Sequence, residues 1–152
     1  MGIGAKPAGE LLLKSDLYEI RAEGRVVRCA LNIPVRTAPA LGANAAVDMG
    51  EWLVNNVLKP RSQWVGLIVD VRVGPSVFGP VTRAAIERML TSAQQSRRPL
   101  CVLVGDSSTQ CDQFLEMARL HAPRYSRVTS DPEEAVTWLT TADLEPAMRN
   151  PT

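Results

Sequence analysis

The stretch Trp64-Val65-Gly66-Leu67-Ile68-Val69-Asp70-Val71 is a continuous apolar run that ends beside a single carboxylate. Such a run is typical of a strand that is buried on both faces, as in a parallel sheet covered by helices. A second run of the same kind lies at residues 100–104. These two runs predict the centre of the fold, and the segments around them decide how the sheet is completed.

Segments with helical spacing surround both runs. Residues 41–58 carry apolar side chains at helical intervals, and Pro60 ends the pattern. Residues 81–96 and 109–121 show similar stripes, and a last helix is expected to begin near Pro132, after a short strand at 126–129. Strands that alternate with helices are joined by right-handed crossovers, so the pattern predicts parallel strands.

The N-terminal part predicts a β-hairpin. Two apolar segments, 17–22 and 26–31, flank the sequence Glu23-Gly24-Arg25. Gly24 can adopt the positive φ that a tight connection requires. The preceding Leu11-Leu12-Leu13 either extends the first strand or covers the sheet edge.

The sequence therefore predicts an α/β fold with an N-terminal β-hairpin followed by alternating helices and strands. We expect a mixed sheet of about four to five strands with about four helices. The length of 152 residues fits one domain, which we place at 11–140. Residues 1–10 are expected to be a disordered tail, and residues 141–152 a loose C-terminal tail.

Composition excludes several classes of function. The net charge is +1, so there is no field to attract nucleic acid. No apolar stretch is long enough to span a membrane. The cysteines Cys29, Cys101 and Cys111 form no Cys-x-x-Cys pair, which favours a reducing compartment and predicts a cytoplasmic protein. No metal or cofactor is expected, because His121 is the single histidine and no thiols or carboxylates cluster with it.

The element order resembles that of the STAS domain, the fold of anti-sigma-factor antagonists and of small SpoIIAA-like bacterial proteins. The resemblance rests on the opening hairpin, on the strand Gly66-Leu67-Ile68-Val69-Asp70-Val71, and on the strand Leu100-Cys101-Val102-Leu103-Val104-Gly105 with the elements after it. It implies a bacterial, non-enzymatic signalling module that acts as a regulator or scaffold by binding proteins. In that family a phosphorylatable serine opens the helix after the central strand, whereas this chain has Phe78-Gly79-Pro80 there.

Two turns contain candidate phosphorylation or anion sites. Ser76 and Thr82 flank a Gly/Pro-rich turn before a predicted helix, and Ser107 and Ser108 follow the second buried strand. Backbone N–H groups and the helix dipole favour a phosphate at such places, although the same residues are also common as helix caps. The alternative function is therefore a sensor domain that binds a small anion or nucleotide.

The segment 41–58 carries apolar side chains on more than one face. Met49, Trp52 and Val54 are candidate contacts with a protein partner, which includes a second copy in a homodimer. The other interpretation is that the N-terminal segment covers this surface.

An enzyme is the least favoured interpretation. Cys111 lies near the start of a predicted helix, where a thiolate is favoured, and His121 could act as an acid or base. Neither has a recognisable catalytic partner in the sequence, so we assign no catalytic residue.

Overall fold

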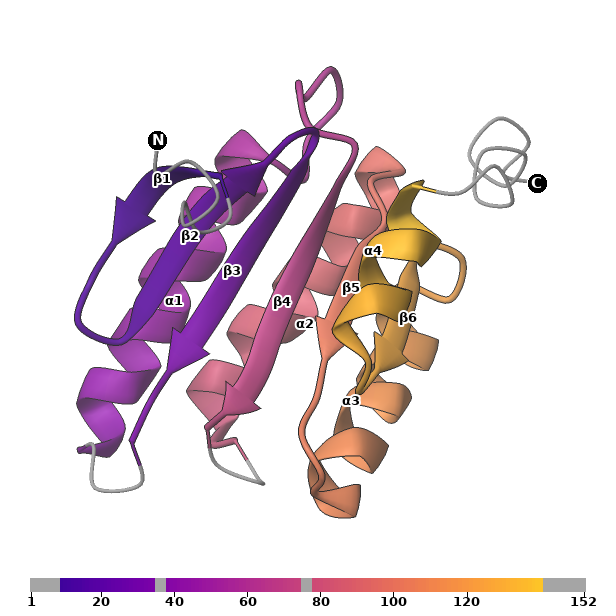
Figure 1. The fold of residues 1–152 in the computed structure, drawn as a ribbon. Helices are drawn as coiled ribbons and strands as arrows, with labels where there is room; N and C mark the ends of the chain where they lie inside the picture. The colour runs from indigo at the N-terminus through magenta and orange to yellow at the C-terminus, as the bar shows by residue number, and fades with distance from the viewer. Residues whose placement is uncertain (1–8, 35–37, 75–77, 141–152) are drawn as a thin grey trace.

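The computed structural model describes residues 9–34, 38–74 and 78–140 and contains a six-stranded sheet in the order β1-β2-β3-β4-β5-β6 (Figure 1). The strands are β1 (Glu10–Lys14), β2 (Tyr18–Glu23), β3 (Val26–Asn32), β4 (Gly66–Val73), β5 (Leu100–Leu103) and β6 (Ser126–Thr129). The helices are α1 (Pro39–Asn56), α2 (Pro80–Ser96), α3 (Ser108–His121) and α4 (Pro132–Thr140).

The sheet is mixed, as the sequence predicts. Strands β1, β2 and β3 pair antiparallel, and β3 to β6 pair parallel. Gly24 connects β2 to β3 with φ +67°, which confirms the predicted hairpin. The sheet has one strand more than the upper predicted number, because Leu11-Leu12-Leu13 belongs to a separate edge strand, β1, whose pairing with β2 shifts register between Leu11 and Leu13.

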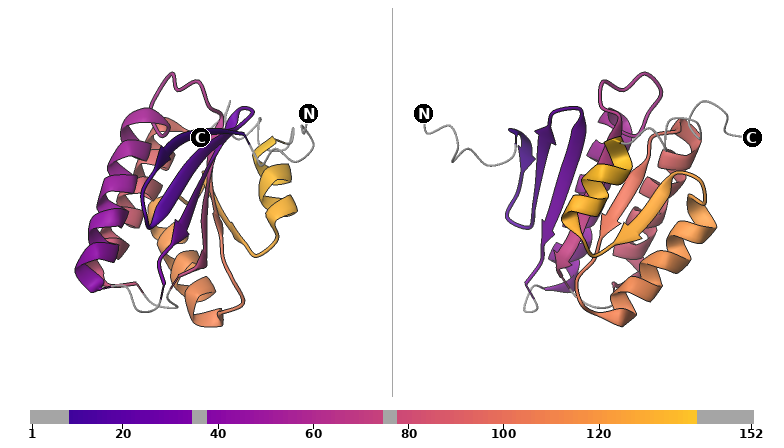
Figure 2. Two further views of the ribbon diagram at one scale, coloured as in Figure 1. Left: turned by 60° about the vertical axis from the view of Figure 1, so that its left-hand side comes forward. Right: turned by 45° about the vertical axis from the view of Figure 1, so that its right-hand side comes forward.

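The helices lie on both faces of the sheet but unequally. Helices α1, α2 and α3 cover one face, and α4 lies alone on the other (Figure 2). Each of the three connections from β3 to β6 leads to the adjacent strand, so the parallel part is wound in one direction only. Helix α4 turns back after β6 and packs across β5 and β6.

Two apolar clusters follow from this arrangement. The larger cluster lies between the sheet and α1 to α3 and includes the fully buried side chains of Ile20, Met49 and Phe114. The smaller cluster lies under α4, where Ile68 and Cys101 pack with side chains from α4. Strand β4 contributes to both clusters, which explains why its sequence is apolar without alternation.

Gly66, the first residue of β4, lies where three parts of the chain meet closely. A Cβ atom at this position would lie 2.9 Å from the Pro99 carbonyl oxygen and 2.9 Å from Leu139 Cδ2. The Pro99 carbonyl accepts a hydrogen bond from the Leu67 N–H at 2.9 Å and therefore cannot move freely. Glycine at this position allows α4 to approach the start of β4.

We predict that Gly66→Ala destabilises the protein by about 1–3 kcal/mol, because the added methyl group overpacks this contact. The matched control is Gly79→Ala, where φ is −70° and a Cβ would meet no atom within 4 Å. The control is expected to change stability by less than about 0.5 kcal/mol. Urea unfolding of both variants measures the difference, and equal stabilities would contradict the close approach.

Candidate functional site

The carboxyl ends of the parallel strands are the first place to look for a ligand site. Ligands of open α/β sheets bind in the crevice where the strand order reverses and neighbouring connections diverge to opposite faces. In this sheet the order is sequential, and α1 to α3 lie on one face (Figure 2). The winding therefore creates no crevice of that kind between the parallel strands.

The turn after β5 holds the predicted residues Ser107 and Ser108. The Ser107 hydroxyl caps α3 by accepting a hydrogen bond from the Gln110 N–H at 3.1 Å, and Ser108 is the exposed first residue of the helix. The Gln110 side chain accepts from the Gly105 N–H at 2.9 Å and donates to the Val71 carbonyl at 3.1 Å. The Gly105 N–H, the Ser107 hydroxyl and the Gln110 side chain are thus engaged in closing the turn, whereas Ser108 remains exposed.

We predict that Gln110→Ala lowers the free energy of unfolding by about 2–3 kcal/mol, because it leaves the Val71 carbonyl and the Gly105 N–H without this partner. Gln95→Ala is the matched control, since Gln95 is exposed on α2 and alanine favours a helix. Thermal and urea unfolding report both changes. If the two variants lost the same stability, the buried amide would not be what holds the turn.

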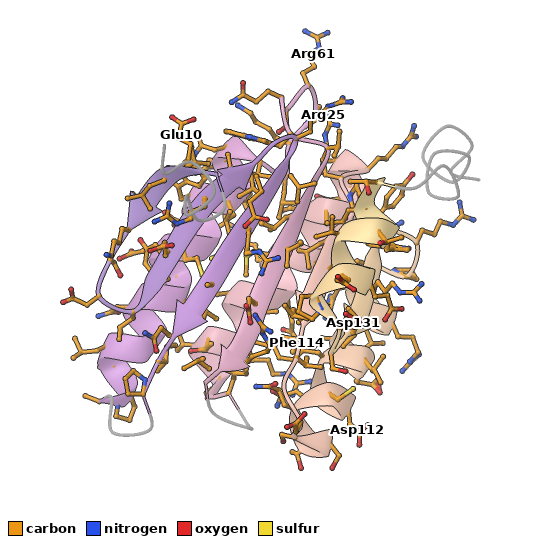
Figure 3. All side chains as sticks on the ribbon, in the orientation of Figure 1. Glu10, Arg25, Arg61, Asp112, Phe114 and Asp131 are labelled. Carbon is orange, nitrogen blue, oxygen red and sulfur yellow. The ribbon has the colours of Figure 1, made fainter. Side chains whose placement is uncertain are left out.

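The segment before α2 and the first turn of that helix contain the other predicted pair, Ser76 and Thr82. Ser76 lies outside the described residues, and Thr82 is buried at 7% exposure. Phe78 is buried and packs edge-on against Phe114, with ring centroids 5.6 Å apart. Phe114 points into the molecule, whereas Asp112 on the same helix projects into solvent (Figure 3). A core aromatic side chain therefore stands just before α2.

The sheet face opposite α1 to α3 is polar beyond the cover of α4. Asp70 on β4 is 8% exposed, and its carboxylate accepts hydrogen bonds from the Arg72 N–H at 3.0 Å and from the Arg72 guanidinium at 2.7 Å and 3.0 Å. The carboxylate that ends the central apolar run is thus satisfied within its own strand.

The same face carries two arginines that lie directly opposite each other, Arg21 on β2 and Arg28 on β3. Like charges in this position destabilise a strand pair. Here Arg21 forms an ion pair with Glu19, and Arg28 Nε lies 3.1 Å from Glu23. Each arginine therefore has a carboxylate beside it, while the buried Arg28 Nε has no hydrogen-bond partner among the described residues.

The two residues of the enzyme interpretation lie apart from any described cavity. His121 Nε2 is 3.5 Å from Glu87, and its Nδ1 is 3.5 Å from the Thr91 hydroxyl, so the imidazole bridges two positions of α2. Cys111 is partly buried against the larger cluster. Neither residue lines the two cavities described for this chain. In the described ranges, no three His, Cys, Asp or Glu side chains gather in a way that could hold a metal ion.

We predict that only one of the three thiols reacts with iodoacetamide in the native protein. Cys29 and Cys101 are fully buried, and burial raises the pKa of Cys29 above its usual range and that of Cys101 to about 12. Reaction requires an accessible thiolate, which leaves Cys111. Intact-mass analysis is expected to show one adduct before unfolding and three afterwards. Native Cys111→Ser protein is expected to show none, and an adduct on it would contradict this packing.

The predicted partner contacts on α1 are less exposed than the sequence implies. Met49 is completely buried in the larger cluster and offers no surface to a partner. Trp52 and Val54 are partly buried against the same cluster. Much of the apolar surface of α1 is therefore used inside the domain.

An apolar groove with a volume of about 390 Å³ lies between α1 and α2. We call it the α1/α2 groove. Its lining from α1 is Val47, Gly50 and Glu51, and its lining from α2 is Pro80, Val81, Ala84, Ala85 and Arg88. Val47 is 37% and Val81 51% exposed, so the apolar lining is open to solvent.

The groove is possible because the two helices approach closely at small residues. A Cβ on Gly50 would lie 3.6 Å from the Ala85 carbonyl oxygen and 3.8 Å from its Cβ. At the rim, Arg88 Nη1 lies 3.9 Å from Glu51 Oε2, and both side chains are more than half exposed. Sequence reasoning missed the α2 half of this surface. The sequence feature that could have indicated this surface is the presence of small residues on both helices, Gly50 on α1 and Ala84 and Ala85 on α2.

The described residues define a class of fold: a singly wound α/β domain with a mixed six-stranded sheet, three helices on one face and one helix on the other (Figure 2). Searches with this chain found no matching family model, curated protein or solved structure. The described residues also contain no helix that is long and apolar enough to cross a lipid bilayer.

Proposed function

We propose that this protein is a non-enzymatic regulatory or scaffold module that acts by binding another protein through the α1/α2 groove. The single observation that carries the proposal is the solvent-open apolar lining of this groove. Exposed apolar surface with a polar rim is typical of protein-interaction sites. The element order supports a STAS-like type of module, and the three free cysteines are consistent with a cytoplasmic location.

The shape of the groove favours a helix as the binding element. Its lining combines small residues, Gly50, Ala84 and Ala85, with the larger Val47 and Val81. A helix can place a ridge of side chains into such a depression between two helices. A small polar ligand would find few hydrogen-bonding groups there, since only Glu51 and Arg88 are charged and they face each other.

The two turns with candidate anion sites also favour protein binding over anion binding. Gly105 and Ser107 donate and accept hydrogen bonds within their own turn, and Thr82 is buried. A phosphate that bound the Gly105 N–H or the Ser107 hydroxyl would have to displace these internal partners. The protein-binding function therefore requires less rearrangement of the described structure than the anion or nucleotide sensor does.

We predict that a photo-crosslinking side chain at position 84 captures a protein, and that the same side chain at position 120 does not. Leu120 is 57% exposed on α3 and is the matched control, because it is an exposed apolar helix residue outside the groove. Adducts are identified by mass spectrometry in extracts of cells that express the chain. Where the captured protein is not this chain, excess unlabelled wild-type protein is expected to suppress the adduct at position 84; where it is this chain, the excess wild-type protein is itself captured.

Excess Val81→Glu protein is expected not to suppress that adduct, because it places a charge in the apolar groove. A glutamate in the first turn of α2 is favourable for the helix, so loss of competition would reflect the surface rather than unfolding. Leu120→Glu protein is expected to compete as the wild type does. Absence of any adduct at position 84, or equal competition by Val81→Glu protein, would overturn the proposed function.

A further inference from the structure

We propose that the occupant of the α1/α2 groove is the same groove of a second copy of this chain, in a two-fold symmetric dimer. This inference rests on the proposed function, because it names the partner of that same surface. The argument comes from the charge pattern of the rim, from the arrangement of ridge and hollow, and from the area that two helices offer.

The rim of the groove carries one charge of each sign. Glu51 stands on α1 and Arg88 on α2, 58% and 55% exposed, and their closest charged atoms are 3.9 Å apart. An exposed pair at this separation contributes little stability to the domain. Both charges are therefore available to a partner at small cost.

A two-fold axis through the groove would pair these charges between copies. In a two-fold interface, if residue i of one copy contacts residue j of the other, the reciprocal contact also forms. Glu51 of each copy would then face Arg88 of the other, which gives two intermolecular pairs. A strongly acidic or basic partner would satisfy only one of the two charges and would repel the other.

The apolar part of the groove is self-complementary in the same way. Val81 lines the groove and is half exposed, and Gly50 and Ala84 line it without large side chains. A second copy presents both features, so the Val81 ridge of each copy can pack into the hollow of the other. This arrangement places α1 and α2 of both copies in a four-helix interface.

The available area predicts a weak dimer. Helices α1 and α2 have 18 and 17 residues, so each is about 26 Å long. With helix diameters of about 10 Å, the pair offers on the order of 500 Å² per copy. The total of about 1,000 Å² lies at the lower limit for a specific interface. We therefore expect association that depends on concentration rather than a permanent dimer.

The deciding experiment uses the single charge reversals Glu51→Arg and Arg88→Glu. Each homodimer would bring two like-charge pairs together, so sedimentation velocity is expected to show a dissociation constant at least about tenfold above that of the wild type. An equimolar mixture of the two variants would form two attractive pairs in the heterodimer. Association in the mixture is expected to return to within about threefold of the wild type.

The mixture separates intermolecular from intramolecular effects. Within each variant chain, positions 51 and 88 still carry like charges, so restored association can arise only from contacts between copies. Thermal unfolding of each variant verifies that the domain is intact, since both positions are exposed on helices. The additional variant Val81→Glu is expected to remain monomeric at every concentration at which the wild type associates.

Three results would overturn the inference. The wild type could remain monomeric up to millimolar concentration, the charge reversals could leave association unchanged, or the mixture could associate no better than the separate variants. In each case an adduct with a different protein at position 84 would still support the proposed function. The failure of the dimer and the failure of protein binding are therefore distinguishable.

Discussion

The burial of β4 on both faces is the constraint on which the other parts of the structure depend. Leu67, Val69 and Val71 face the larger cluster under α1 to α3, and Ile68 faces the smaller cluster under α4. A strand of this kind needs a helix on each side, because its apolar side chains project alternately to both faces. Helix α4 meets that need and can do so closely because residue 66 has no side chain.

Helix α4 covers only part of its face of the sheet, and polar side chains occupy the part that it leaves uncovered. Where its cover ends along β4, the next residue on that face is Asp70, whose carboxylate is held by Arg72. Further from α4, on β2 and β3, Arg21 and Arg28 lie opposite each other with a carboxylate beside each. These charged side chains complete a sheet face that no described helix covers (Figure 1). Each of these three arginines lies beside a carboxylate.

Periodicity predicted most of the fold because the segments are locally consistent. The apolar runs of β4 and β5, the stripes of α1 to α3 and the glycine of the hairpin all carry strong local signals. Two features of the structure were not predicted from the sequence. The edge strand β1 was ambiguous because Leu11-Leu12-Leu13 lacks alternation and contains a register shift. The exposure of α1 was misjudged at Met49, because helical spacing alone does not reveal which of two stripes the sheet and α2 will bury.

The candidate surface was harder to predict than the fold because it belongs to two helices at once. Val47 and Val81 lie far apart in the sequence and come to line one groove only when α1 packs against α2. Small residues at a contact between two helices have two consequences. They allow the helix backbones to come close together, and their short side chains leave a shallow depression on the solvent side of the contact. The same residues that pack α1 against α2 therefore also create the apolar groove. The described parallel strands are wound in one direction and have no switch point, so a groove between helices is the surface that we propose for recognition.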